Sequence, residues 1–150
     1  MKKAYEYSST VEWKEKKIGT ISFSDKRKPT CEIAVAPEFF GHGGIITPED
    51  LFVSSVNTCL MSYFLNASEK MRAKFSSYRS VARATLSEKG IDYVFTSVLL
   101  AIEVTVADEK QKKKAERALA MARDGCFVSN SLKADVMVEF NVSVTLQNDL

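Results

Sequence analysis

The chain has 150 residues, of which 45% are hydrophobic and 27% charged, and its 21 basic and 19 acidic side chains leave a net charge of +2. A chain of this length and composition can bury a core, so we expect one globular domain over residues 1–150. The small net charge gives no reason to expect nucleic acid as a partner, and no apolar run is long enough to span a bilayer. No apolar segment follows the basic residues near the N-terminus, so we expect a cytoplasmic protein without a membrane partner.

Strand patterns fill the first third of the chain. Residues 11–13, 18–24 and 31–36 alternate apolar and polar side chains, which is typical of β-strands. The alternation in the third segment places Cys31 in the strand core. Residues 37–44 then interrupt the pattern with several glycines and predict a loop.

The clearest helix start follows this loop. Thr47 is a capping residue, Pro48 suits the first helical position, and the two acidic residues after it favour the positive helix end. We expect a helix from Pro48 to about Ala73, with apolar residues on more than one face and burial on most sides. A single chain of this size cannot cover such a helix, so we expect a homodimer.

A strand pair and a second helix follow. The strand patterns 79–88 and 91–106 meet at a short glycine turn and predict a hairpin. The next helix should begin after an Asp108 cap, with Gln111 as its capping-box partner, and stop at Gly125. Its basic residues are balanced by acidic ones, which indicates a solvated face rather than a nucleic-acid surface.

The last alternating segment, residues 134–146, predicts a final strand. The resulting order β-β-β-α-β-β-α-β predicts an α+β fold in which an antiparallel sheet packs on a long central helix. The three cysteines are widely spaced and accompany a single histidine. This pattern favours neither a disulfide framework nor a zinc site, and we expect no metal and no bound cofactor.

Cys59 and Cys126 form a candidate redox pair, although a free cysteine more often serves as a small core residue. A thiol becomes nucleophilic when a cation, a helix N-terminus or a hydrogen-bond donor stabilises its thiolate. Cys59 lies well beyond the first turn of its helix, so its activation must come from another segment. Cys126 follows the helix-ending Gly125, where carbonyl groups disfavour a thiolate. We therefore expect Cys59 to attack and Cys126 to resolve.

Two motifs resemble those of the OsmC/Ohr family. Residues 47–59, with Pro48-Glu49 and Cys59, are similar to its first-cysteine helix, and residues 122–132 are similar to its second-cysteine motif. The resemblance covers nearly the whole chain and implies an OsmC-like fold, an intertwined homodimer and a peroxidase that reduces organic hydroperoxides. It also implies that Cys59 is peroxidatic, that Cys126 is resolving, and that Glu49 orients an activating arginine. We expect an external dithiol as the reductant.

The activating cation is where the sequence departs from the family pattern, because no arginine occupies the positions from which the family supplies it. Arg27, the only arginine among the first seventy residues, lies in a charged turn. Lys17 offers charge without the fixed fork of a guanidinium. Glu49 lies about 15 Å from Cys59 along a straight helix, so it can act only from the dimer partner or through a break in the helix. Otherwise it simply favours the helix N-terminus.

Aromatic residues near both cysteines suggest an apolar pocket for the peroxide, although core packing is their commoner use. The pocket candidates are Phe39, Phe40, Tyr63 and Phe127. The same fold with inert thiols would instead be a non-catalytic binding protein for a small hydrophobic or thiol ligand. A third alternative is a hydrolase in which His42 activates Cys59, although a loop histidine without a catalytic role is the commoner case.

Overall fold

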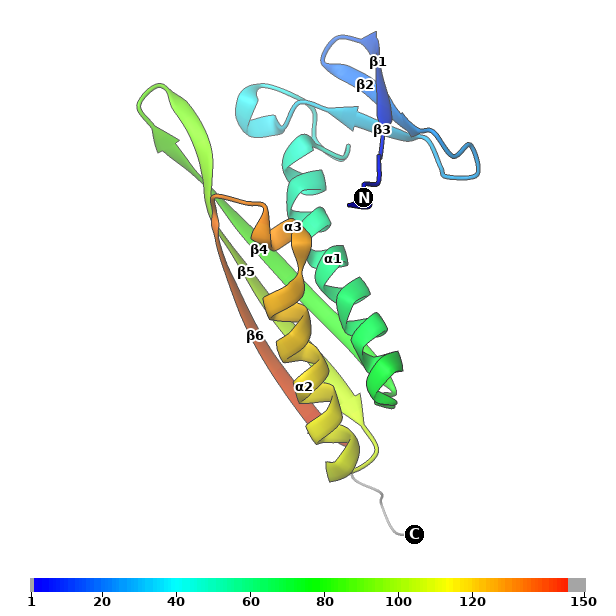
Figure 1. The fold of residues 1–150 in the computed structure, drawn as a ribbon. Helices are drawn as coiled ribbons and strands as arrows, with labels where there is room; N and C mark the ends of the chain where they lie inside the picture. Colours follow the sequence, from blue (N-terminus) through cyan, green and yellow to red (C-terminus); the bar gives the residue numbers. More distant parts are fainter. Residues whose placement is uncertain (1, 146–150) are drawn as a thin grey trace. The chain divides into compact units, whose positions relative to one another are not determined.

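The structure is a computed structural model that describes residues 2–145. Figure 1 shows the elements, which are β1 (Ser9–Glu15), β2 (Ile18–Phe23), β3 (Cys31–Ala34), η1 (Pro37–Phe39), α1 (Pro48–Met71), β4 (Ser77–Lys89), β5 (Asp92–Val106), α2 (Glu109–Gly125), α3 (Phe127–Asn130) and β6 (Asp135–Val144). The described residues divide into two compact units between Phe52 and Val53, inside α1. Each unit holds one three-stranded sheet. The assignment of the whole chain to one domain stays a prediction.

The first unit confirms the three predicted strands, which form the antiparallel sheet β1-β2-β3. The prediction that Cys31 lies in the core is wrong, because Cys31 is half-buried while Ala34 and Ala36 are buried. In the glycine-rich loop, the backbone of Gly41 lies close to that of Val35. A Cβ on Gly41 would lie 1.6 Å from the carbonyl oxygen of Val35. The close approach of these two backbone segments leaves no room for a side chain at position 41.

The start of α1 is confirmed at Pro48. The backbone N–H of Asp50 donates to Thr47 Oγ1 at 3.2 Å, and the backbone N–H of Thr47 donates to Asp50 Oδ2 at 2.9 Å. This reciprocal capping box satisfies donors that would otherwise lack a partner at the helix end. At the other end the helix stops at Met71, two residues before the predicted Ala73, because Arg72 adopts a left-handed conformation with φ 51°.

The prediction that α1 is buried on most sides included a second copy of the chain, so it stays a prediction. The helix buries one stripe, made of Val56, Leu60, Phe64, Ala67 and Ser68. These residues recur at the spacing of one helical face. Met61 and Leu65, which lie outside this stripe, are exposed.

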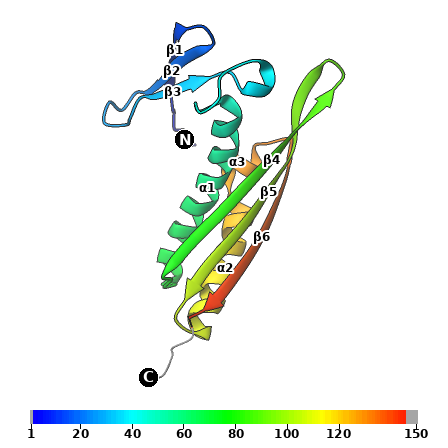
Figure 2. The same cartoon turned by 180° about the vertical axis from the view of Figure 1, so that it is seen from behind.

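In the second unit, the part of α1 from Val53 onward and α2 pack on the same face of the sheet β4-β5-β6 (Figures 1 and 2). The expectation of a wholly antiparallel sheet is wrong, because β5 pairs antiparallel with β4 but parallel with β6. The cause is α2, which carries the chain back across the sheet before β6 begins, as parallel neighbours require. Leu146, the predicted end of the last strand, lies outside the described residues.

The second helix begins as predicted at Asp108, whose carboxylate accepts the backbone N–H of Gln111 at 2.8 Å. A capping box also predicts that the Gln111 side chain accepts the backbone N–H of Asp108. The bond observed for this side chain is a different one. Gln111 Oε1 instead accepts the backbone N–H of Lys74 at 2.7 Å, which ties the start of α2 to the segment after α1. Among the described helices, none is long and apolar enough to cross a membrane.

Candidate functional site

The two cysteines of the predicted pair come from different helices of the second unit. Cys59 is half-buried in α1, one turn before Tyr63 on the same side of the helix. Cys126 is fully buried between α2 and α3. It is the C-cap residue of α2 and the N-cap residue of α3. Its backbone N–H donates to Ala122 at 2.9 Å and its carbonyl accepts from Asn130 at 3.0 Å. The main chain around Cys126 is therefore fixed from both sides.

The structure brings the two thiols into contact. The Cys59 side chain is hydrogen-bonded to that of Cys126, and neither residue is in a disulfide. The Cys126 sulfur also accepts a hydrogen bond from Ser129 Oγ at 3.2 Å. A reduced pair in contact is a candidate for disulfide formation.

Burial is the largest influence on Cys59, and it raises the pKa of the thiol above its ordinary value. The next largest influence, the backbone N–H of Val128, lowers the pKa, and the N–H of Phe127 acts in the same direction more weakly. The hydrogen bond with Cys126 raises it further. The net result is a raised pKa, and none of these influences from the described chain is a cation.

Gly125, next to Cys126, packs against the ring of Tyr63, which occupies the space that a side chain at position 125 would need. A Cβ at position 125 would lie 2.5 Å from Cζ and 2.6 Å from the hydroxyl oxygen of Tyr63. The sequence predicts Gly125 as a helix stop, and it is the last residue of α2. The structure adds a second reason for glycine, because any side chain there would displace the Tyr63 ring.

Replacing Gly125 with alanine should lower the free energy of unfolding by about 1–3 kcal/mol, the usual cost of overpacking. Helix propensity alone predicts the opposite, a gain of up to about 1 kcal/mol. Urea unfolding of the wild type, Gly125→Ala, Tyr63→Ala and the double variant checks the cause. Alanine at position 125 should cost less in the Tyr63→Ala background, and an equal cost in both backgrounds would contradict the clash.

Phe127, another predicted pocket residue, directly follows Cys126, and the pocket roles of Phe127 and Tyr63 stay predictions. Phe127 is 70% exposed, so its ring does not line an enclosed pocket within the single chain. Its backbone N–H, rather than its ring, acts on the Cys59 sulfur. No sequence pattern pointed to this amide, to that of Val128 or to the hydroxyl of Ser129. The only available signal was the position of Ser129 three residues after Cys126.

Glu49 belongs to the first unit and lies in the first turn of α1. Its Oε2 atom is buried, with no hydrogen-bond partner in the described part of the chain. A buried carboxylate oxygen normally has a donor. The helix is continuous from Pro48 to Met71, so it contains no break through which Glu49 could approach Cys59. A role for Glu49 from the partner subunit stays a prediction.

The two candidate cations lie in the first unit. Arg27 is bonded to Asp25 through Nε at 3.0 Å and Nη2 at 2.8 Å, and its side chain is 91% exposed. Lys17 Nζ donates to the carbonyl oxygen of Phe39 at 3.3 Å. Neither of these contacts involves a cysteine, and activation of Cys59 by either residue stays a prediction.

The remaining candidates of the first unit surround the glycine-rich loop. Phe39 is half-buried, while Phe40 is exposed and left-handed with φ 60°. His42 is half-buried, and its backbone N–H donates to Val35 at 3.0 Å. The pocket role of the two phenylalanines and the activation of Cys59 by His42 stay predictions.

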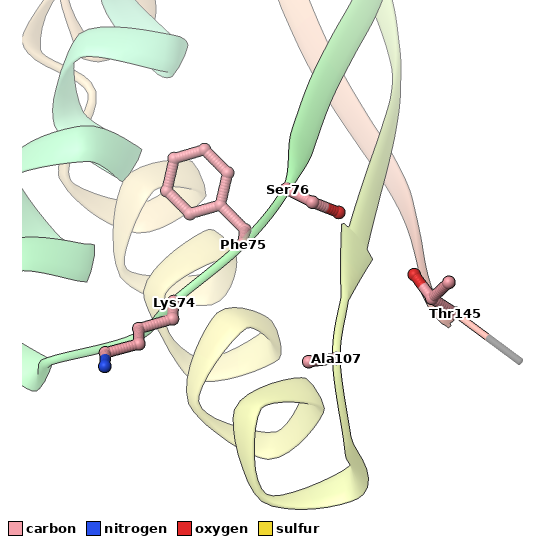
Figure 3. Close-up of a pocket in the computed structure, with 5 residues that line it drawn as sticks. All are labelled: Lys74, Phe75, Ser76, Ala107 and Thr145. Carbon is pink, nitrogen blue, oxygen red and sulfur yellow. The ribbon is translucent and has the colours of Figure 1, made fainter. Parts of the chain in front are cut away.

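A pocket of about 340 Å³ lies in the second unit, next to the segment that follows the C-terminal end of α1 (Figure 3). It is lined by Lys74, Phe75, Ser76, Ala107 and Thr145. Cys59 lies about 18 Å from the end of α1, which itself precedes the pocket, so this pocket does not serve the thiols. Within residues 2–145, no group of three His, Cys, Asp or Glu side chains is placed to hold a metal ion.

The protein-family model for OsmC-like proteins matches residues 41–141 of this chain. An OsmC-like protein of Vibrio cholerae has 22% identity and a TM-score of 0.79, with 92% of this chain and 100% of that chain covered. An organic hydroperoxide resistance protein of Legionella pneumophila, also 22% identical, has a TM-score of 0.72 and coverages of 95% and 100%. A protein of the same description from Elizabethkingia anophelis has 18% identity, a TM-score of 0.72 and coverages of 97% and 100%. These likenesses establish the fold, and a search of curated proteins finds no match.

Proposed function

The chain belongs to the OsmC-like protein family, and from this membership and its paired thiols we propose that it reduces organic hydroperoxides. The observation that carries the proposal is the contact of two free thiols, Cys59 and Cys126, which lie far apart in the sequence. Proteins of similar fold from L. pneumophila and E. anophelis are described as organic hydroperoxide resistance proteins.

The proposed reaction has three balanced steps. The Cys59 sulfur attacks one peroxide oxygen, the O–O bond breaks, and the products are an alcohol and a sulfenic acid on Cys59. The Cys126 sulfur then attacks the Cys59 sulfur, an S–S bond replaces the S–O bond, and the thiol proton of Cys126 leaves in water. An external dithiol returns the disulfide to two thiols and is itself oxidised to a disulfide.

Burial and hydrogen bonding support this division of roles. Cys59 is partly exposed and therefore open to a peroxide, whereas Cys126 is fully buried. Two backbone amides, those of Phe127 and Val128, favour negative charge on the Cys59 sulfur. Free thiols fit a reducing compartment such as the cytoplasm.

A homodimer is part of the proposal because α1 leaves apolar side chains uncovered. Met61 and Leu65 are exposed on a face of α1 that lies outside its buried stripe. A second copy that covers this face would bury apolar surface, which favours association. It would also allow the partner's Glu49 to serve the thiols.

A second candidate function is non-catalytic binding of a small hydrophobic or thiol ligand. The observation that favours it is the raised pKa of Cys59, which leaves the thiol mostly protonated at neutral pH. A protonated thiol reacts slowly with peroxides. The pH dependence of the first step separates the two functions.

The loss of the Cys59 thiol should become about tenfold faster per pH unit from pH 6 to 8. The thiolate is the nucleophile, and the raised pKa places its formation above this range. The experiment mixes reduced Cys126→Ser protein with cumene hydroperoxide and follows Cys59 by mass spectrometry, so that only the first step is measured. A rate independent of pH would contradict the raised pKa. Complete absence of reaction would support the binding protein.

A further inference from the structure

We propose that Ser129 is a positioning residue for the resolving thiol of Cys126. The inference rests on the proposed peroxide chemistry and concerns its second step, the formation of the disulfide. Ser129 acts through the sulfur of Cys126 and does not touch the peroxide.

The geometry that supports this role is an inverted helix cap. Cys126 is the cap residue before α3, and its side chain accepts no backbone hydrogen bond from the helix. In an ordinary cap, the side chain of the first residue accepts a backbone N–H from the second or third helical residue. Here the hydroxyl of Ser129, the third residue of α3, donates to the Cys126 sulfur at 3.2 Å. The bond holds the sulfur in one direction relative to α3.

The burial of Cys126 makes a dedicated donor useful. The Cys126 side chain is fully buried, so water cannot solvate its sulfur as negative charge develops there. Its other hydrogen-bond partner, the thiol of Cys59, becomes a sulfenic acid in the first step of the proposed reaction. The hydroxyl of Ser129 takes no part in that conversion and continues to donate to the attacking sulfur.

In the second step the Cys126 sulfur forms a bond to the Cys59 sulfur while the S–O bond of the sulfenic acid breaks. The oxygen leaves as water, which takes the proton originally on the Cys126 thiol. A hydrogen bond from Ser129 favours this step in two ways. It restricts the sulfur to one orientation, and it stabilises the negative charge of the nucleophile.

The test follows the lifetime of the Cys59 sulfenic acid in a single turnover. Reduced full-length protein is mixed with an equal amount of cumene hydroperoxide and quenched at intervals into dimedone, and intact masses give the sulfenic acid and the disulfide. Ser129→Ala should prolong the sulfenic acid about tenfold, the effect of losing one hydrogen bond to a charged group. The rate at which the sulfenic acid first appears should not change.

Three matched variants separate positioning from a structural effect. Ser129→Thr keeps the hydroxyl and should restore disulfide formation, whereas Ser129→Val has the shape of threonine without the hydroxyl and should not. Ser131→Ala removes the hydroxyl of the C-cap residue of α3, which donates to the carbonyl of Phe127 at 2.6 Å, and should behave as wild type. The inference is overturned if Ser129→Ala forms the disulfide at the wild-type rate, if valine restores it as well as threonine, or if Ser131→Ala slows it equally. If wild-type protein forms no sulfenic acid, the proposed function fails instead.

Discussion

Replacing Cys59 with serine is expected to lower the rate of cumene hydroperoxide reduction by at least about a thousandfold, to the level without protein. A serine hydroxyl at this half-buried position is not deprotonated at neutral pH and cannot form the sulfenic acid. The assay measures cumyl alcohol formed with dithiothreitol as the external dithiol. Cys31→Ser is the matched control, because Cys31 is also half-buried but lies in β3 of the first unit. Loss of activity in the control, or retention in Cys59→Ser, would contradict the assignment.

Replacing Cys126 with serine should have a different result, which is measured without dithiothreitol because a dithiol would itself reduce the sulfenic acid. The first step should persist, because Cys59 still reacts with the peroxide. Without a resolving thiol, the sulfenic acid should accumulate and, with excess peroxide, progress to sulfinic acid on Cys59. Mass spectrometry distinguishes these additions of oxygen from a disulfide. Wild-type peroxide consumption by Cys126→Ser with no added oxygen on Cys59 would remove the resolving role.

Replacing Phe64 with alanine is expected to have the largest effect on stability, a loss of about 3–5 kcal/mol in the free energy of unfolding. Phe64 is fully buried, and its ring centroid lies 5.1 Å from that of Phe75 and 5.2 Å from that of Tyr78. The substitution removes both ring contacts and leaves a cavity between α1 and β4. Urea unfolding measures the loss.

The matched control is Asn66→Ala, two residues along the same helix on its exposed side. Its effect should stay within about 0.5 kcal/mol, since surface substitutions rarely change stability more. If Phe64→Ala were as stable as Asn66→Ala, α1 would not be packed on β4 through this ring. The pair of variants therefore tests the register of the helix on the sheet.

Most of the helices and strands could be predicted because their sequence signals lie within a few neighbouring residues. The Thr47–Pro48 start, the Asp108 cap of α2 and the strand pattern of β5 follow from residues a few positions apart, and the structure confirms each of them. The direction of β6 depends on how α2 crosses the sheet, and the alternation of β6 is the same in parallel and antiparallel pairing. The expectation of an antiparallel partner was therefore wrong.

Part of the candidate site could likewise be predicted from local sequence, and part could not. The two cysteines could be found from their flanking motifs, and the structure places them in contact. The donors around them could not be found, because the amides of Phe127 and Val128 belong to the main chain and have no sequence signature. The constraint on Gly125 comes from Tyr63, which is distant in the sequence, so helix-end rules alone did not reveal it.

The most direct test of the thiol-pair account is the disulfide map of wild-type protein after one equivalent of cumene hydroperoxide. Reduced protein is treated, alkylated under denaturing conditions, digested and analysed by mass spectrometry. We predict a single disulfide between Cys59 and Cys126, with Cys31 alkylated as a free thiol. Full alkylation of Cys59 and Cys126 after prolonged exposure, or a disulfide that includes Cys31, would contradict the account.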